Sequence, residues 1–170
     1  FEERFAMIYK AVREKHPEIT VVGTVGPFYE GTDYAEGWRL ATEMGVPMVD
    51  EHYYVDPGWM IHNQDYYDRY DRTKSKVYLG EYAAHLPGRP NNIETALAEA
   101  LYLTSVERNA DVVRLATYAP LFAHVDAWQW NPDLIWFDNL RMMRTPNYYV
   151  QQMYGMNAGT DVLNLQMDGK

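Results

Sequence analysis

Segments with helical spacing alternate with short apolar runs along the whole sequence, and this alternation limits the folds open to the chain. Apolar spacing and end signals predict helices over residues 1–15, 32–45, 58–72, 91–109 and 145–159. Apolar, often β-branched runs predict strands over residues 18–27, 46–54, 76–84, 111–122 and 161–168. Such alternation is typical of a parallel sheet wrapped by helices. The four β/α units fit half of an eight-stranded barrel or a small doubly wound sheet.

Composition narrows the classes of function. The chain has 170 residues and is 47% hydrophobic, which is enough to fill the core of one domain. The net charge of -9 is the wrong sign for a nucleic-acid-binding protein, and no apolar run is long enough to cross a bilayer. The absence of cysteine excludes disulfides, thiolate metal sites and cysteine nucleophiles. The 15 Tyr and 5 Trp suit sugar rings, but they suit cores equally well.

In both candidate folds, the chemistry lies at the carboxyl ends of the strands. Those ends carry polar and aromatic side chains, in the segments TVGPFYEG, DEHYYVDPGW, GEYAAH and TYAPLFAHVDAWQW. The turns on the opposite side, such as RTKSK, are plainly polar. This asymmetry predicts one active face.

Glu81 is the sharpest candidate on that face. It follows an apolar strand directly, and Gly80, Ala83 and Ala84 leave room for a ligand beside it. A carboxylate in this position can act as nucleophile or as acid/base in glycoside chemistry. The alternative is a solvated acid in a loop.

His52, Tyr53 and Tyr54 form a second cluster. They are candidates for hydrogen bonding to a sugar hydroxyl or to Glu81, and a tyrosine hydroxyl on that carboxylate would stabilise its charge. The alternative is a histidine and tyrosines in the core. Asp50 and Glu51 either join this cluster or face solvent.

The tryptophans Trp128, Trp130 and Trp136 lie in a long predicted loop after the fourth strand. Exposed at the active face, they would form a platform for a sugar. The alternative is packing beneath the loop.

A metal site is a further possibility with weaker support. Potential ligands are present, namely Asp50, His52, Glu81, His85 and His124. No HExxH or similar spacing occurs, and neither a phosphate-binding glycine loop nor a GxSxG elbow is present. We therefore expect no metal and no cofactor.

Four segments in combination resemble a known family. GEYAAH, ALAEALYLTSVERNADVVRLATYAPLF, WNPDLIWFDN and TPNYYVQQMYGMNAG look like the second half of the catalytic domain of α-L-arabinofuranosidases of glycoside hydrolase family 51. The resemblance implies an α/β fold, a partial (β/α)8 TIM barrel holding strands five to eight, in residues 1–159. Residues 160–170 would begin a truncated C-terminal β-sandwich.

The resemblance also implies roles for single residues. Glu81 matches the nucleophile of a retaining double displacement, and His52, Tyr53 and Tyr54 match the motif that lines the sugar subsite, with Tyr54 preferred over Tyr53. The acid/base of this family lies in an Asn-Glu pair, which this sequence lacks. It would fall upstream of Phe1. A retaining mechanism needs two carboxyl groups about 5–5.5 Å apart, so we expect the isolated chain to be inactive. Because a half barrel leaves two strand edges unpaired, we also expect the chain to self-associate.

The implied function is release of terminal α-L-arabinofuranosyl residues from plant polysaccharides such as arabinan and arabinoxylan. The implied partners are this carbohydrate, the N-terminal half of the barrel and a second copy in a homo-oligomer, with no nucleic acid and no membrane. The sequence does not determine the cellular location, and a secreted or periplasmic location is preferred over the cytoplasm. The alternatives are an endoglucanase-like retaining glycosidase with a similar barrel and a non-catalytic carbohydrate-binding domain.

Overall fold

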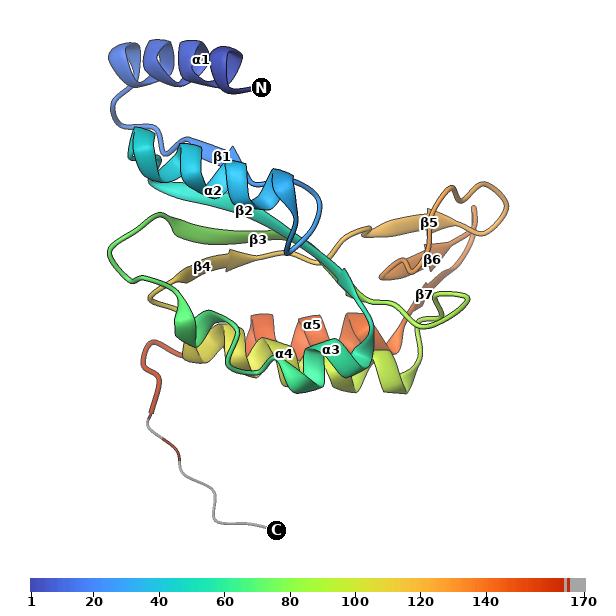
Figure 1. Ribbon diagram of the computed structural model, residues 1–170. Helices are drawn as coiled ribbons and strands as arrows, with labels where there is room; N and C mark the ends of the chain where they lie inside the picture. The colour runs from blue at the N-terminus through green and yellow to red at the C-terminus, as the bar shows by residue number, and fades with distance from the viewer. Residues whose placement is uncertain (164, 166–170) are drawn as a thin grey trace.

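The computed structural model describes residues 1–163 and 165 and shows one parallel sheet flanked by helices (Figure 1). The helices are α1 (Glu2–Lys15), α2 (Thr32–Met44), α3 (Pro57–His62), α4 (Ile93–Arg108) and α5 (Pro146–Met156), with a 3₁₀ turn η1 (Tyr67–Arg69). The strands are β1 (Val22–Thr24), β2 (Met48–Val55), β3 (Lys76–Ala84), β4 (Val113–Ala116), β5 (Phe122–His124), β6 (Ile135–Phe137) and β7 (Met142–Arg144).

The main sheet has the strand order β1-β2-β3-β4, and all three pairings are parallel. Each strand therefore lies beside its neighbour in the chain, and α2, α3 with η1, and α4 form the successive crossovers. A doubly wound sheet needs a point at which the order reverses. The main sheet has no such point, so the doubly wound alternative does not fit.

The two faces of β2 differ in burial. Val49, Glu51, Tyr53 and Val55 are buried, whereas Asp50, His52 and Tyr54, which alternate with them, are half-buried. β3 continues this pattern with Val77 and Leu79 in the core. Side chains alternate between the faces of a strand. The second face of the sheet is therefore partly open, and it carries the polar side chains of the strand ends.

End signals in the sequence agree with the helix boundaries. The side chain of Thr145 caps α5 by accepting a bond from Tyr148 N, and Pro146 is its first residue. Gly45 ends α2 in the left-handed conformation with φ 63°, which glycine adopts without strain. At its other end, Gly31 is the N-cap of α2 and Thr32 is already helical.

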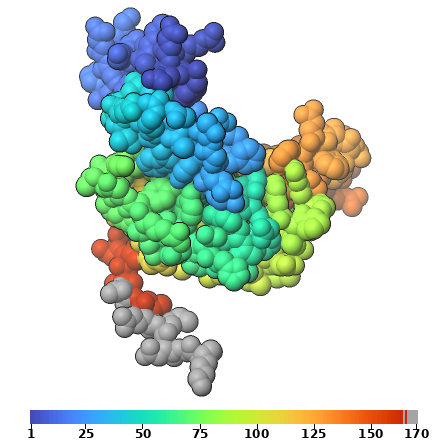
Figure 2. Space-filling model, in the orientation of Figure 1, coloured from blue at the N-terminus to red at the C-terminus, as the bar shows by residue number. Residues whose placement is uncertain are grey.

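Several predicted elements are shorter or divided. The strand predicted over 18–27 forms only at Val22–Thr24, and the helix predicted over 58–72 ends at His62, followed by η1. The strand predicted over 111–122 stops at Ala116, and the predicted loop beyond it forms a second sheet in which β5 pairs parallel with β6 and β6 antiparallel with β7. This sheet projects from the main body in Figure 2.

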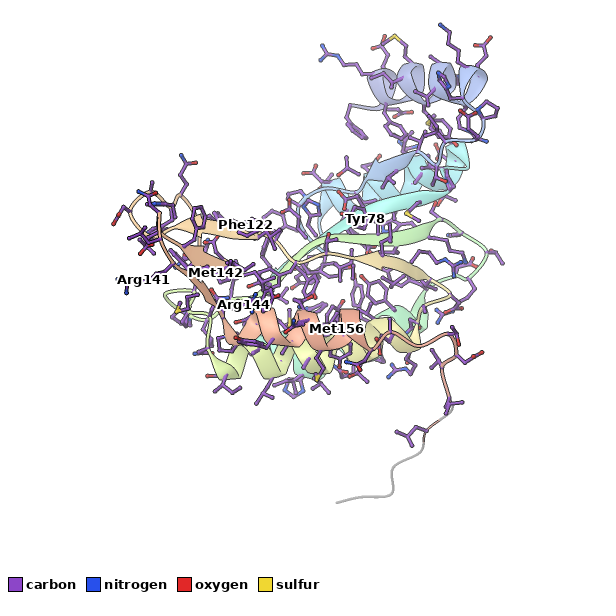
Figure 3. The ribbon with its side chains drawn as sticks, turned by 180° about the vertical axis from the view of Figure 1, so that it is seen from behind. Tyr78, Phe122, Arg141, Met142, Arg144 and Met156 are labelled. Atoms are coloured by element: carbon purple, nitrogen blue, oxygen red, sulfur yellow. The ribbon has the colours of Figure 1, made fainter. Side chains whose placement is uncertain are left out.

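The small sheet leads into α5. Seen from behind, Figure 3 shows Phe122 and Met142 on this sheet and Arg144 where β7 approaches α5. Phe122 and Met142 are both exposed.

Two further predictions concern the end of the chain and membranes. Residues 161–163 are not part of a strand, and the remainder of the strand predicted over 161–168 lies largely outside the described residues, as does most of the predicted start of a sandwich at 160–170. Within the part of the chain that the structure describes, no helix has the length and apolar character needed to cross a bilayer.

Candidate functional site

An irregularity between β2 and β3 sets the direction of Glu81. The strands pair as Glu51 with Leu79, but the next pair is His52 with Glu81, so Gly80 is an extra residue in β3. Bulges of this kind turn the following side chain and are common beside active sites. Here the bulge brings Glu81 level with His52. A side chain at Gly80 is not possible without movement, because its Cβ would collide with Asp50 Oδ1.

Glu81 is bound by side chains of the neighbouring strand. The Tyr54 hydroxyl donates to Glu81 Oε2 at 2.6 Å. His52 Nδ1 lies 3.6 Å from the same oxygen, while His52 Nε2 lies 3.0 Å from Asp50 Oδ2. The side chain of Glu81 remains 42% exposed. The expected contact between a tyrosine hydroxyl and Glu81 is therefore present, and the carboxylate can still be reached from solvent.

The electrostatics of these groups follow from their contacts. The hydrogen bond to Asp50 raises the pKa of His52, burial opposes this shift, and the charges of Asp50 and Glu81 add to it. Burial and then the bond to Glu81 raise the pKa of Tyr54 above its usual value. Tyr54 therefore keeps its proton and remains a donor to Glu81.

Tyr53 and Glu51 lie in the core, which corrects two expectations. Both side chains are fully buried, and the Tyr53 hydroxyl donates to Glu51 Oε2. Further donors surround this carboxylate, from Tyr34, Trp38, Tyr67 and Tyr70. Burial raises the pKa of Glu51, although these bonds oppose the shift. Tyr53 has no surface that a sugar could contact, and Glu51 neither joins the site nor faces solvent.

Two further rings lie beside Tyr54, the residue that donates to Glu81. The His85 ring stacks on Tyr54 with centroids 5.1 Å apart, and the Trp130 ring lies 6.0 Å from Tyr54. The Arg89 guanidinium lies 4.3 Å from the centre of the Trp130 ring. Trp128 instead packs edge-on against Trp136, 6.0 Å away. The structure thus brings Trp130, but not Trp128, into contact with the rings next to Glu81.

Glu99 and His85 have environments that the sequence did not indicate. Glu99 is fully buried on α4 and accepts bonds from Ala84 N at 2.9 Å and Asn147 Nδ2 at 2.7 Å, which ties the end of β3 to α5. Burial raises its pKa to about 7. An acidic residue on a helix is normally exposed to solvent, so nothing in the sequence indicated that Glu99 is buried. The sequence offers His85 only as a potential metal ligand, whereas in the structure burial and then the charge of Arg89 lower its pKa to about 4.

Asp50 and Glu81 both contact His52, but the five potential metal ligands do not gather into one group. Among the described residues, no group of three or more His, Asp or Glu side chains is arranged to hold a metal ion. His124 lies apart on β5, where its Nδ1 accepts a bond from Asp126 N.

Sequence comparisons place the chain among arabinofuranosidases. The family model for the α-L-arabinofuranosidase C-terminal domain matches residues 61–170. The chain is 46% identical to an extracellular exo-α-L-arabinofuranosidase of Streptomyces chartreusis, over 96% of this chain and 19% of the relative. It is 34% identical to a probable α-L-arabinofuranosidase A of Aspergillus terreus, over 99% of this chain and 26% of the relative. The chain thus spans about a fifth to a quarter of these relatives.

Structural comparisons agree. An arabinose-bound family 51 α-L-arabinofuranosidase superposes with a TM-score of 0.80 at 27% identity, over 92% of this chain and 25% of that one. A family 51 enzyme from Bifidobacterium longum has the same fold, with a TM-score of 0.71 at 10% identity over 92% of this chain and 39% of its own. The match of the family model begins within α3, although the sheet continues across that point. The chain belongs to the α-L-arabinofuranosidases of glycoside hydrolase family 51.

Proposed function

We propose that the chain is the nucleophile-bearing half of a (β/α)8 catalytic barrel, with β1 to β4 as strands five to eight. The parallel order without reversal supports this arrangement. Within the described residues, β1 pairs only with β2 and β4 only with β3. In a closed barrel, these two edges would pair with strands supplied by the rest of the parent polypeptide.

Glu81 is the nucleophile in this proposal, and its setting is the observation that carries it. The carboxylate stands near the carboxyl end of β3, partly exposed, with Tyr54 donating to one oxygen. In a retaining mechanism, an oxygen of this carboxylate attacks the anomeric carbon as the leaving group accepts a proton from a second carboxylic acid. Water then attacks the glycosyl-enzyme ester, gives up a proton to that second group and releases Glu81 as a carboxylate. The second group belongs to the parent polypeptide outside this chain.

The substrate is a terminal α-L-arabinofuranosyl residue, as found on arabinan and arabinoxylan. The arabinose-bound state named for the structural relative and the exo activity named for the Streptomyces relative support this assignment. The Streptomyces enzyme is also named extracellular, which supports action outside the cell. In this proposal Trp130 packs against the sugar or its leaving group, which its position beside Tyr54 and His85 supports.

The barrel spans residues 1–159 in this proposal, and residues 160–170 begin a β-sandwich. The name of the matching family model, a C-terminal domain, supports a domain that continues beyond the barrel. The isolated 170-residue chain is expected to be inactive and to self-associate. It has only one of the two carboxyl groups, and it exposes apolar side chains such as Leu115 on the edge strand β4.

Trapping the intermediate tests this function on the full-length parent. A 2-fluoro-arabinofuranosyl donor with a good leaving group should inactivate the enzyme and add one fluorosugar to the peptide that contains Glu81. A matched Glu107→Ala variant, altered at an exposed glutamate of α4, should be labelled as well as the wild type. Label on a different carboxylate, or turnover without any covalent adduct, would contradict the assignment.

A further inference from the structure

Asp50 is an unusual feature of the open face of the sheet. Its side chain is 25% exposed, and only Oδ2 has a partner, His52 Nε2 at 3.0 Å. The other oxygen, Oδ1, is buried and has no hydrogen-bond partner in the described part of the chain. A buried carboxylate oxygen without a donor destabilises a fold. Something other than stability is therefore expected to favour an acid at this position.

Gly80 leaves the space that the Asp50 carboxylate occupies. The collision of any Cβ at Gly80 with Asp50 Oδ1 shows that the Asp50 side chain lies directly over the bulge. The residue that makes room for Asp50 is thus the same residue that turns Glu81 towards His52. The positions of Asp50, Gly80 and Glu81 are coupled through one local irregularity.

His52 connects the two acids. Residues 50 and 52 point to the same face of β2, because side chains alternate along a strand. The bond from Nε2 to Asp50 fixes the ring, and this leaves Nδ1 facing Glu81 Oε2 at 3.6 Å. The charged groups that face the ring are Asp50 on its own strand and Glu81 on β3.

We propose that Asp50 is a positioning residue for the reaction of Glu81: it holds the His52 ring with Nδ1 directed at the nucleophile and favours the charged imidazolium. The inference rests on the proposed function of Glu81. An imidazolium in this place stabilises the Glu81 carboxylate as it leaves the glycosyl-enzyme ester. Asp50 balances the charge of that imidazolium while Glu81 is esterified and neutral. The raised pKa of His52 agrees with this arrangement.

The first test is a titration of His52 by NMR in the full-length enzyme with labelled histidine and without substrate. A His52→Gln variant assigns the signal. Asp50→Asn keeps the size of the side chain but removes its charge. We expect it to lower the pKa of His52 by about one unit, a tenfold change in the proton-binding constant. The alkaline limb of kcat for an aryl arabinofuranoside should then move to lower pH, because kcat includes the step in which Glu81 leaves the glycosyl-enzyme ester.

Gly80→Ala is the second variant, because it displaces Asp50 without altering any ionisable group. It should shift the His52 titration in the same direction as Asp50→Asn. The control is Asp71→Asn, at an exposed aspartate that bonds Thr73 before the amino end of β3, whereas Glu81 lies near the carboxyl end of that strand, and it should leave the titration unchanged.

An unchanged His52 titration in both Asp50→Asn and Gly80→Ala would overturn the proposal. The NMR measurement does not depend on turnover, so it separates this inference from the proposed function. If His52 shifts as expected but Glu81→Ala retains full activity, the contact between Asp50 and His52 is real. In that case both the role of Asp50 in the reaction and the proposed function of Glu81 are wrong.

Discussion

The Tyr54 hydroxyl donates a 2.6 Å hydrogen bond to Glu81 Oε2, across the boundary between β2 and β3. The contact depends on the bulge at Gly80, which pairs Glu81 with His52 in place of the residue expected from the preceding register. A single extra residue thus brings the carboxylate within reach of both Tyr54 and His52.

Removal of this donor should reduce activity. In the full-length enzyme, Tyr54→Phe keeps the ring that stacks on His85 but loses the bond to Glu81. Hydrogen bonds to charged groups are worth about 1.5–3 kcal/mol, so kcat/KM should fall by roughly 10- to 100-fold. The matched control is Tyr149→Phe, at an exposed tyrosine of α5, which should retain wild-type kinetics. Wild-type kinetics in Tyr54→Phe would show that the bond has no role in the reaction.

Loss of the hydroxyl of Tyr53, the preceding residue, should reduce stability and leave substrate binding unchanged. Tyr53→Phe removes one donor to the buried Glu51 carboxylate and leaves those from Tyr67, Tyr70 and Trp38. We expect a loss of about 1–3 kcal/mol in the free energy of unfolding, measured by denaturant titration. KM at temperatures well below unfolding should be unchanged. A raised KM with unchanged stability would instead return Tyr53 to the sugar subsite.

The contrast between these two tyrosines shows which features could be predicted from the sequence and which could not. The run from Lys76 to Ala84 and the caps of α5 were predictable, because apolar runs and capping residues are local signals. The place of Glu81 near the end of a buried strand was visible for the same reason. Which of Tyr53 and Tyr54 reaches it depends on the register of two strands distant in sequence. A glycine inside a strand, such as Gly80, suggests a bulge, but it does not determine the register that follows.

Buried acids and very short strands were missed for related reasons. Glu51 follows Asp50 in a polar segment, and its burial depends on rings delivered from α2 and η1. The strands β5, β6 and β7 have three residues each, too few to show a period in the sequence.

Glu99 should make stability depend on pH. Burial raises its pKa from 4.5 to about 7, so the folded protein binds more protons than the unfolded chain between these values. Its stabilising contribution is fully present below pH 4.5 and is lost as the pH rises to about 7. Glu99→Gln should remove this part of the slope, by about 3 kcal/mol at most. Denaturation at pH 5 and pH 8 measures it, and equal slopes in both proteins would show that Glu99 titrates normally.

Trp130 and Trp128 should differ in their effect on substrate binding. Trp130 lies against Tyr54 and His85, so Trp130→Ala should raise KM for an arabino-oligosaccharide by about fivefold, as expected for the loss of about 1 kcal/mol of aromatic contact. Trp128→Ala removes a ring of the same size that packs on Trp136 and should change KM less. Equal effects of the two variants would place both rings in the subsite, and a larger effect of Trp128 would contradict the arrangement.

The most direct test of the account is azide rescue of Glu81→Ala in the full-length enzyme. With 4-nitrophenyl α-L-arabinofuranoside, the variant should lose nearly all hydrolysis. Azide occupies the space of the lost carboxylate and should restore turnover, giving a glycosyl azide of inverted configuration. That result would identify Glu81 as the nucleophile of a retaining enzyme. Hydrolysis close to wild type in Glu81→Ala without azide would contradict the central claim.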